Sequence, residues 1–262
     1  MSDPDPAARS GAAIGLDHVG IVGADLDRLA ESFAGLGFHV TPFAAHESGR
    51  TGNRCVMLRD GGYLELIAKV PGQASATLDR FLAIGPGAHI LALEIADEVA
   101  ALARLHRACV PTGEATVTER DSGLTGAKSR FAVIMPPDQP EGRVLLVRQL
   151  TRELLWRPDN IAHPNRTAAL TEAVYATDTP AEIMTRLSRL AGRPAEPDPL
   201  GGYRISLARG CVRVLPRAVA SAIFPGAPGA PPMIGLTVAT EAVSASVVHA
   251  GGVAIRFAAA SG

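Results

Sequence analysis

One order of secondary structure returns along this chain, and it restricts the available folds more than any other feature. A strand-like segment at residues 14–23 leads into an amphipathic helix that Asp25 is placed to cap, and three strand-like segments follow. The same β-α-β-β-β order returns from residue 89 and again from residue 170. A fourth round begins at residue 233 and stops short of completion. Such recurrence predicts a chain assembled from similar modules that pack on one another.

Individual segments follow from the same patterns. In the first module the expected strands are residues 38–43, 54–60 and 63–70, and a two-glycine turn makes the last two a hairpin. Residues 224–233 are rich in proline and glycine, which predicts a loop between the third and fourth modules. The helix of the second module is expected to turn three aliphatic side chains toward the core: Val99, Leu102 and Leu105.

The composition is that of an ordinary globular protein. Hydrophobic residues make up 47% of the 262 residues and charged residues 19%, which is enough apolar material for a well-packed core. The formal net charge of -1 gives no reason to expect a nucleic acid or an anionic membrane as a partner. No apolar run approaches the roughly 20 residues that a membrane span needs.

The cysteines and the N-terminus indicate the cellular setting. Cys55, Cys109 and Cys211 are odd in number and far apart, which argues against a disulfide framework and against a cysteine-rich zinc site. Residues 1–13 are acidic and rich in proline and alanine, so they predict a disordered lead-in and not a signal peptide. We therefore expect a cytoplasmic protein.

Three stretches resemble one known family. The segments LDHVGIVGADLDRLAESFAGLGF, TGNRCVMLRDGGYLELI and QLTRELLWRPDNIAHPN are similar to signatures of the glyoxalase-like branch of the vicinal oxygen chelate superfamily. The resemblance covers about residues 14–165. It implies an α+β fold of tandem βαβββ modules that form curved, cup-shaped mixed β-sheets with flanking helices. The implied domains are a first module pair at residues 14–158 and a degenerate, truncated second pair at 159–262.

The resemblance also implies a metal site in the first cup. The implied ligands are His18 on the first strand and Glu65 on the last strand of the first module, with Gln149 at the matching position of the second module. His89 is a weaker candidate ligand, because aligning the two modules places Ile90 and not His89 in the ligand column. Imidazole, carboxylate and amide donors suit a divalent ion such as Zn, Mn, Ni or Fe.

Other residues complete the candidate site. Glu65 is also the candidate for moving a substrate proton, and Asn53 and Arg54 are candidates for binding substrate oxygens. Each has an ordinary structural alternative. A strand histidine such as His18 is commonly a buried residue with satisfied hydrogen bonds, and Gln149 is equally compatible with a polar strand end.

Two functions from different classes stay open at this point. The first is a metal-dependent lyase or isomerase that acts on a small oxygenated substrate inside the cup. The second is a metal-free protein that binds or sequesters a small molecule, of the bleomycin-resistance type. This fold hosts both, so the fold does not choose between them. In either case the expected partner is a small molecule, and a homodimer is compatible with the second module pair.

Overall fold

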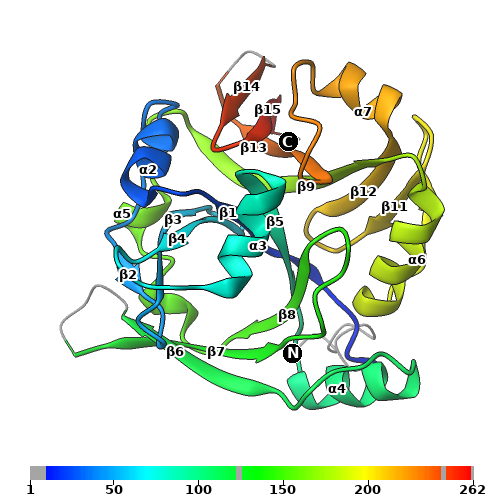
Figure 1. Ribbon diagram of the computed structural model, residues 1–262, viewed down its shortest axis with the longest axis horizontal. Helices are drawn as coiled ribbons and strands as arrows, with labels where there is room; N and C mark the ends of the chain where they lie inside the picture. The colour runs from blue at the N-terminus through cyan, green and yellow to red at the C-terminus, as the bar shows by residue number, and fades with distance from the viewer. Residues whose placement is uncertain (1–9, 122–125, 243–245, 261–262) are drawn as a thin grey trace.

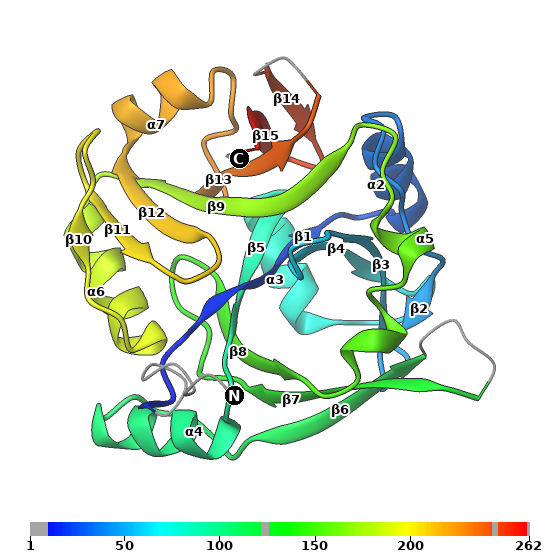
Figure 2. The ribbon, with the colours of Figure 1, turned by 180° about the vertical axis from the view of Figure 1, so that it is seen from behind.

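The computed structural model describes residues 10–121, 126–242 and 246–260 of the chain. Its strands form one 15-stranded mixed sheet that curves strongly, with helices packed around it (Figures 1 and 2). The sheet contains four copies of one unit, in each of which the first strand pairs in parallel with the last. The predicted α+β fold of tandem βαβββ modules is confirmed.

The first module supplies the left side of Figure 1. Its elements are β1 (Gly15–Val22), α2 (Leu26–Ala34), β2 (Ala44–Ala45), β3 (Thr51–Met57) and β4 (Tyr63–Lys69). The Asp25 side chain accepts hydrogen bonds from the backbone N–H groups of Asp27 and Arg28, so the helix begins where the sequence predicts. Leu29 and Phe33 on α2 are buried against the sheet.

The second module completes the first cup. Its elements are β5 (Gly87–Glu94), α4 (Glu98–Arg107), β6 (Thr116–Asp121), β7 (Lys128–Ile134) and β8 (Arg143–Gln149). Strand β5 runs antiparallel to β1, which joins the two modules into one curved surface. The linking helix α3 (Ala76–Ile84) packs Leu78 and Phe81 against Ile67 and Ile90 of that surface.

The second module pair follows the same order of elements, but fewer elements are described in its fourth module. The third module comprises β9 (Thr167–Thr177), α6 (Pro180–Ala191), β10 (Glu196–Pro197), β11 (Tyr203–Ser206) and β12 (Cys211–Pro216). The fourth comprises β13 (Met233–Thr240), β14 (Ser246–Ala250) and β15 (Val253–Ala259). Between β13 and β14 the described residues include no helix. Strands β9 and β13 pair antiparallel, as β1 and β5 do.

One hydrophobic core spans both pairs. It contains Leu16 and Leu91 from the first pair together with Leu170, Tyr175 and Leu236 from the second. The connection between the pairs runs through a short 3-10 helix (Arg152–Leu154) and α5 (Pro158–Ile161). The division of the chain near residue 158 remains a prediction.

Several local expectations differ from the structure. Residues 38–43 form no strand. The strand at this point of the module is the two-residue β2, which begins directly after them. Helices α3 and α7 (Arg217–Ile223) were not expected from the sequence. Val99 is 73% exposed, because α4 turns Ala101 and Leu105 to the core instead.

Two further expectations concern the N-terminal lead-in and membrane-spanning segments. Of the predicted disordered lead-in at residues 1–13, positions 1–9 lie outside the described residues. Ala12 and Ala13, at its end, are buried. Across the described ranges, no helix is both long and apolar enough to cross a bilayer.

Candidate functional site

Successive side chains of a strand point to opposite faces, so alternate residues of the first cup's strands lie on its concave side. On β1, Val19 and Ile21 point into the main core, whereas His18 lines the concave side. On β4, Leu64 and Leu66 belong to the main core, and three residues line the concave side: Tyr63, Glu65 and Ile67. The expectation that Tyr63, Glu65 and Ile67 share one face therefore agrees with the structure.

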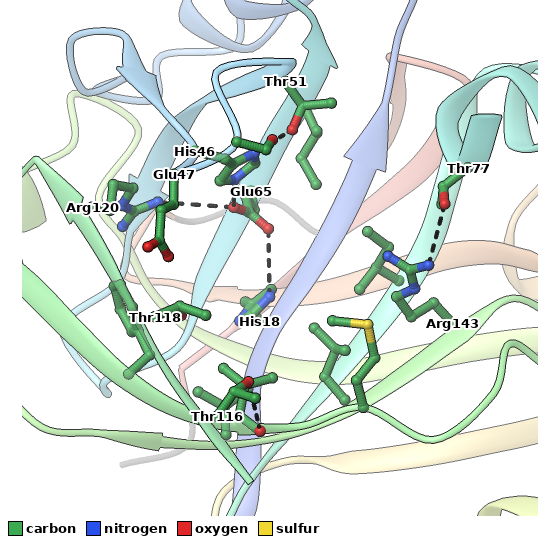
Figure 3. A pocket seen from close by; sticks show the side chains of 18 of the residues that line it. His18, His46, Glu47, Thr51, Glu65, Thr77, Thr116, Thr118, Arg120 and Arg143 are labelled. Carbon is green, nitrogen blue, oxygen red and sulfur yellow. Dashed lines mark hydrogen bonds and ion pairs between the residues drawn. The ribbon is translucent and has the colours of Figure 1, made fainter. Parts of the chain in front are cut away.

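Glu65 is the centre of the polar cluster in this cup (Figure 3). Glu65 is 8% exposed, and the Asn53 amide nitrogen donates to its Oε1. His46 Nε2 lies 3.3 Å from Oε1, and His18 Nε2 lies 3.5 Å from Oε2. Burial alone would raise the pKa of Glu65, but the His46 hydrogen bond and the nearby positive charges outweigh it and hold the pKa well below its ordinary range. Glu65 is therefore ionised.

His18 is held from its other side by a second carboxylate. Its Nδ1 lies 2.6 Å from Asp17 Oδ1, and since a carboxylate can only accept, Nδ1 carries the proton. The Gln149 amide nitrogen donates to both Asp17 oxygens at 3.0 Å. The His18 ring also stacks on Tyr63, with centroids 4.4 Å apart. These contacts fix the ring and direct Nε2 toward Glu65.

Two strand irregularities explain this arrangement. The pairing of β1 with β5 skips Asp17, so Asp17 is the extra residue of a bulge and its side chain reaches the neighbouring His18. The same pairing skips His89 on β5. His89 consequently does not line the cup: it stacks on Phe81 and its Nε2 donates to the Gly85 carbonyl at 2.7 Å.

A buried arginine adjoins the cluster. Arg120 on β6 is 7% exposed, and its Nη1 lies 3.8 Å from Glu65 Oε1 and 3.4 Å from Cys55 Sγ. Its guanidinium also lies over the Phe131 ring, 5.3 Å from the centroid. Thr116 and Thr118, four and two residues earlier on the same strand, line the same cavity.

The cluster forms part of the wall of a cavity of about 680 Å³. Figure 3 shows Arg143 and Thr77 on the side of this cavity away from Glu65 and Arg120. Most of the remaining wall is aliphatic or aromatic: Ile67, Leu78, Ile90, Phe131, Val133, Leu145 and Val147. A mainly apolar cavity with a few converging polar groups is the usual form of a small-molecule site.

The structure brings together only part of the set predicted from sequence. His18, Glu65 and Asn53 meet in the cluster, and Gln149 reaches it only through Asp17. Arg54 is turned away from the cup and donates to Asp27 at 2.9 Å. Ile90, the residue that the module alignment placed in the ligand column, does line the cavity.

These donors do not fit a divalent metal ion. In the part of the chain that the structure describes, no group of three or more His, Cys, Asp and Glu side chains could hold one. The Gln149 amide is engaged with Asp17, His89 lies outside the cup, and Glu65 already accepts from Asn53 beside the positive charge of Arg120. The positive charge of a guanidinium this close would repel a metal cation bound to Glu65.

Two members of the cluster were missed by the sequence analysis. His46 lies in the loop after β2, and an isolated bridge pairs it with Arg120 across the two modules. No local pattern predicts that contact. The alternation of Thr116, Thr118 and Arg120 was a usable signal, because strand residues two apart share a face.

The second module pair has an ion-pair cluster at the equivalent places. Seven positions separate His18 from the helix cap Asp25, and seven separate Glu172 from the cap Thr179. Glu65 pairs with a residue two after His18, and Arg213 pairs with a residue two after Glu172. Glu172 and Arg213 are thus the counterparts of His18 and Glu65.

This second cluster is internally neutralised. Arg213 donates to both oxygens of Asp198 at 2.7 and 2.8 Å, and its Nη1 lies 3.3 Å from Glu172. Arg256 and Thr237 also contact the Glu172 carboxylate. Positions that form an open polar wall in the first cup are closed by ion pairs in the second.

Comparisons with known proteins agree with this fold. A protein from Staphylococcus aureus described as hypothetical has a crystal structure that aligns with a TM-score of 0.73 and 14% identity, over 94% of this chain and all of that one. A mutant of 4-hydroxymandelate synthase from Streptomyces coelicolor aligns with a TM-score of 0.54 and 15% identity, over 87% of this chain and 71% of that one. At these identities the likeness concerns the fold alone. No curated protein matches significantly in sequence.

The family follows from the sequence match. The profile of the glyoxalase-like domain matches residues 16–191, which is well over half of the chain. That span runs from the second residue of β1 through β8, with the polar cluster, to the end of α6 in the second module pair. The chain therefore belongs to the glyoxalase-like domain family.

Proposed function

We propose that the first cup binds one small organic molecule with a mainly apolar body and an oxygenated polar end. The observation that carries this proposal is the cavity of about 680 Å³, whose wall is mainly apolar and holds the Glu65 cluster on one part. Such a cavity gains affinity from the apolar area it buries and orientation from its few polar groups. Of the two functions left open by the sequence, this corresponds to the metal-free binding protein.

A neutral fluorescent probe tests this proposal. N-phenyl-1-naphthylamine is expected to bind saturably with one site per chain. An Ile90→Trp variant, which places an indole inside the cup, is expected to weaken binding at least about tenfold. Ile84→Trp is the matched control, since Ile84 is 47% exposed on α3 and does not line the cavity. Equal binding by the Ile90→Trp variant and the wild-type chain would place the ligand elsewhere.

A specific observation favours a second candidate, an isomerase or lyase that works by proton transfer. Asp17 accepts a hydrogen bond from Nδ1 of His18, and the same imidazole lies on the wall of the cavity, where its Nε2 can exchange a proton with a bound substrate. Glu65, the base expected from the sequence, is less suited to the role because its lowered pKa makes it a weak base. This candidate requires no metal-bound step.

Proton exchange would distinguish the enzyme from the binding protein. For an enzyme, the chain should accelerate exchange of the α-proton of an α-hydroxyketone such as hydroxyacetone in D₂O, followed by NMR. A His18→Gln variant should lose about 100-fold or more of that rate, as expected for removal of a general base. Exchange at the uncatalysed rate with every α-hydroxyketone tried would leave the binding function alone.

The cellular setting is part of the same proposal. Cys55, Cys109 and Cys211 are all free thiols. Three unpaired cysteines support a reducing compartment, such as the cytoplasm.

A further inference from the structure

The arginines of this fold differ in what their guanidinium groups contact. Arg213 and Arg186 each bind both oxygens of one carboxylate, those of Asp198 and Glu141. Arg143, on the wall of the cup, binds both oxygens of Asp138 at 2.7 and 3.1 Å. This fork-to-carboxylate geometry is how a guanidinium withdrawn from water is normally satisfied.

Among the described residues, Arg120 has no such partner. Its closest carboxylate oxygen, on Glu65, is 3.8 Å away, which is too long for a hydrogen bond. Its Nη1 donates only to the Cys55 sulfur, and its buried Nε has no hydrogen-bond partner among the described residues. Burial raises the pKa of Cys55 to about 11, so this sulfur is a neutral thiol and a weak acceptor.

Glu65 is not free to supply the missing contact. Asn53 donates to its Oε1, where His46 also lies at 3.3 Å, and His18 faces its Oε2. Moving the carboxylate toward Arg120 would break these contacts inside a buried site. Arg120 therefore keeps unmet hydrogen-bonding capacity at a place where its side chain lines the cavity.

We propose that the ligand of the first cup is an organic monocarboxylate, whose carboxylate is bound by Arg120 while its apolar body lies against the hydrophobic wall. This inference rests on the proposed binding function and names its ligand class. A planar carboxylate matches the guanidinium fork, and Thr118, two residues earlier on the same strand, adds a hydroxyl group to the same cavity wall. A monocarboxylate adds one negative charge to a wall that already holds Glu65 and Glu47, whereas a doubly charged phosphate would add two.

Two probes of nearly identical shape test the ligand class. 1-Naphthaleneacetate and 1-naphthaleneacetamide differ only in their carboxylate and amide groups, and each is titrated against the chain with bound N-phenyl-1-naphthylamine. The wild-type chain is expected to prefer the carboxylate at least about tenfold, or about 1.4 kcal/mol. Arg120→Gln is expected to reduce that preference to within about twofold.

Arg143→Gln is the matched control for this experiment. It removes an arginine from the same cavity, but one whose charge is already paired with Asp138, so the preference for the carboxylate should be retained. Binding of the neutral probe reports that each variant is folded. Should Arg120→Gln fail to fold, Arg120→Lys keeps the charge and loses the fork, and the preference should fall below that of the wild-type chain.

The outcomes distinguish failure of the carboxylate assignment from failure of the proposed binding function. If the wild-type chain binds the neutral probe and both naphthalene compounds equally well, the cup is a binding site and the carboxylate class is wrong. Undiminished preference in both Arg120 variants would also overturn the assignment. If neither the neutral probe nor either naphthalene compound binds the wild-type chain, the proposed function fails together with the inference.

Discussion

Replacing Glu65 with alanine is expected to lower the free energy of unfolding by about 3–5 kcal/mol at neutral pH. The substitution removes a buried carboxylate and leaves Arg120 as a buried charge without a counterion among the described residues. It also removes the acceptor of the Asn53 amide and the partner of two imidazoles. Urea denaturation of the two chains measures the difference.

Glu65→Gln is the companion variant, and it isolates the charge. The pKa of Glu65 in the fold lies below its ordinary value of 4.5, so the ionised form stabilises the protein above about pH 4.5. That contribution is lost as the pH falls through the folded-state pKa. The stability difference between wild type and Glu65→Gln should therefore be largest near neutrality and shrink in acid. A difference that grows below pH 4.5 would contradict the assigned charge state, and a cost under about 1 kcal/mol for Glu65→Ala would contradict the burial argument.

A comparably large loss, about 3–5 kcal/mol, is expected for Arg213→Ala in the second module pair. Arg213 is 7% exposed, and its removal leaves Asp198 and Glu172 close together without their shared cation. Asp198 is itself 7% exposed, so its charge would be left withdrawn from water.

Arg204→Ala is the matched control for that measurement. Arg204 lies directly opposite Arg213 in the pairing of β11 with β12, but its side chain is 41% exposed and forms its ion pair with the half-exposed Glu196. Pairs of this kind contribute at most about 1 kcal/mol. Equal losses for the two variants, measured by the same urea titration, would show that burial does not set the cost.

The fold was predictable because its signals are local. Caps such as Asp25, glycine turns and alternating strands recur with each module, and each recurrence supports the others. The misses are segments whose structure depends on distant contacts. Residues 38–43 have a strand-like composition but pair with no other strand. Helix α3 is stabilised by packing of Leu78 and Phe81 against Ile67 and Ile90 of the cup.

The site was predictable only where strand alternation determines it. Alternation places His18, Glu65 and Tyr63 on one side of the sheet, and the structure agrees. It could not reveal that Asp17 is a bulge residue, and therefore that Gln149 would bind Asp17.

Long-range contacts were also beyond the sequence. His46 and Arg120 are far apart in the chain and meet only when the two modules curl toward each other. The bridge between them could not be read from either segment alone.

The single core shared by the two module pairs has a consequence for energetics. Leu16 and Leu91 pack in the same cluster as Leu170 and Leu236, and Arg209 of the second pair bonds the Leu16 carbonyl and Glu94 of the first. Neither pair can open without exposing part of the other, so the two halves are expected to unfold as one cooperative unit. By mass action, a molecule held in the first cup would then slow proteolysis of the second module pair, which it never touches.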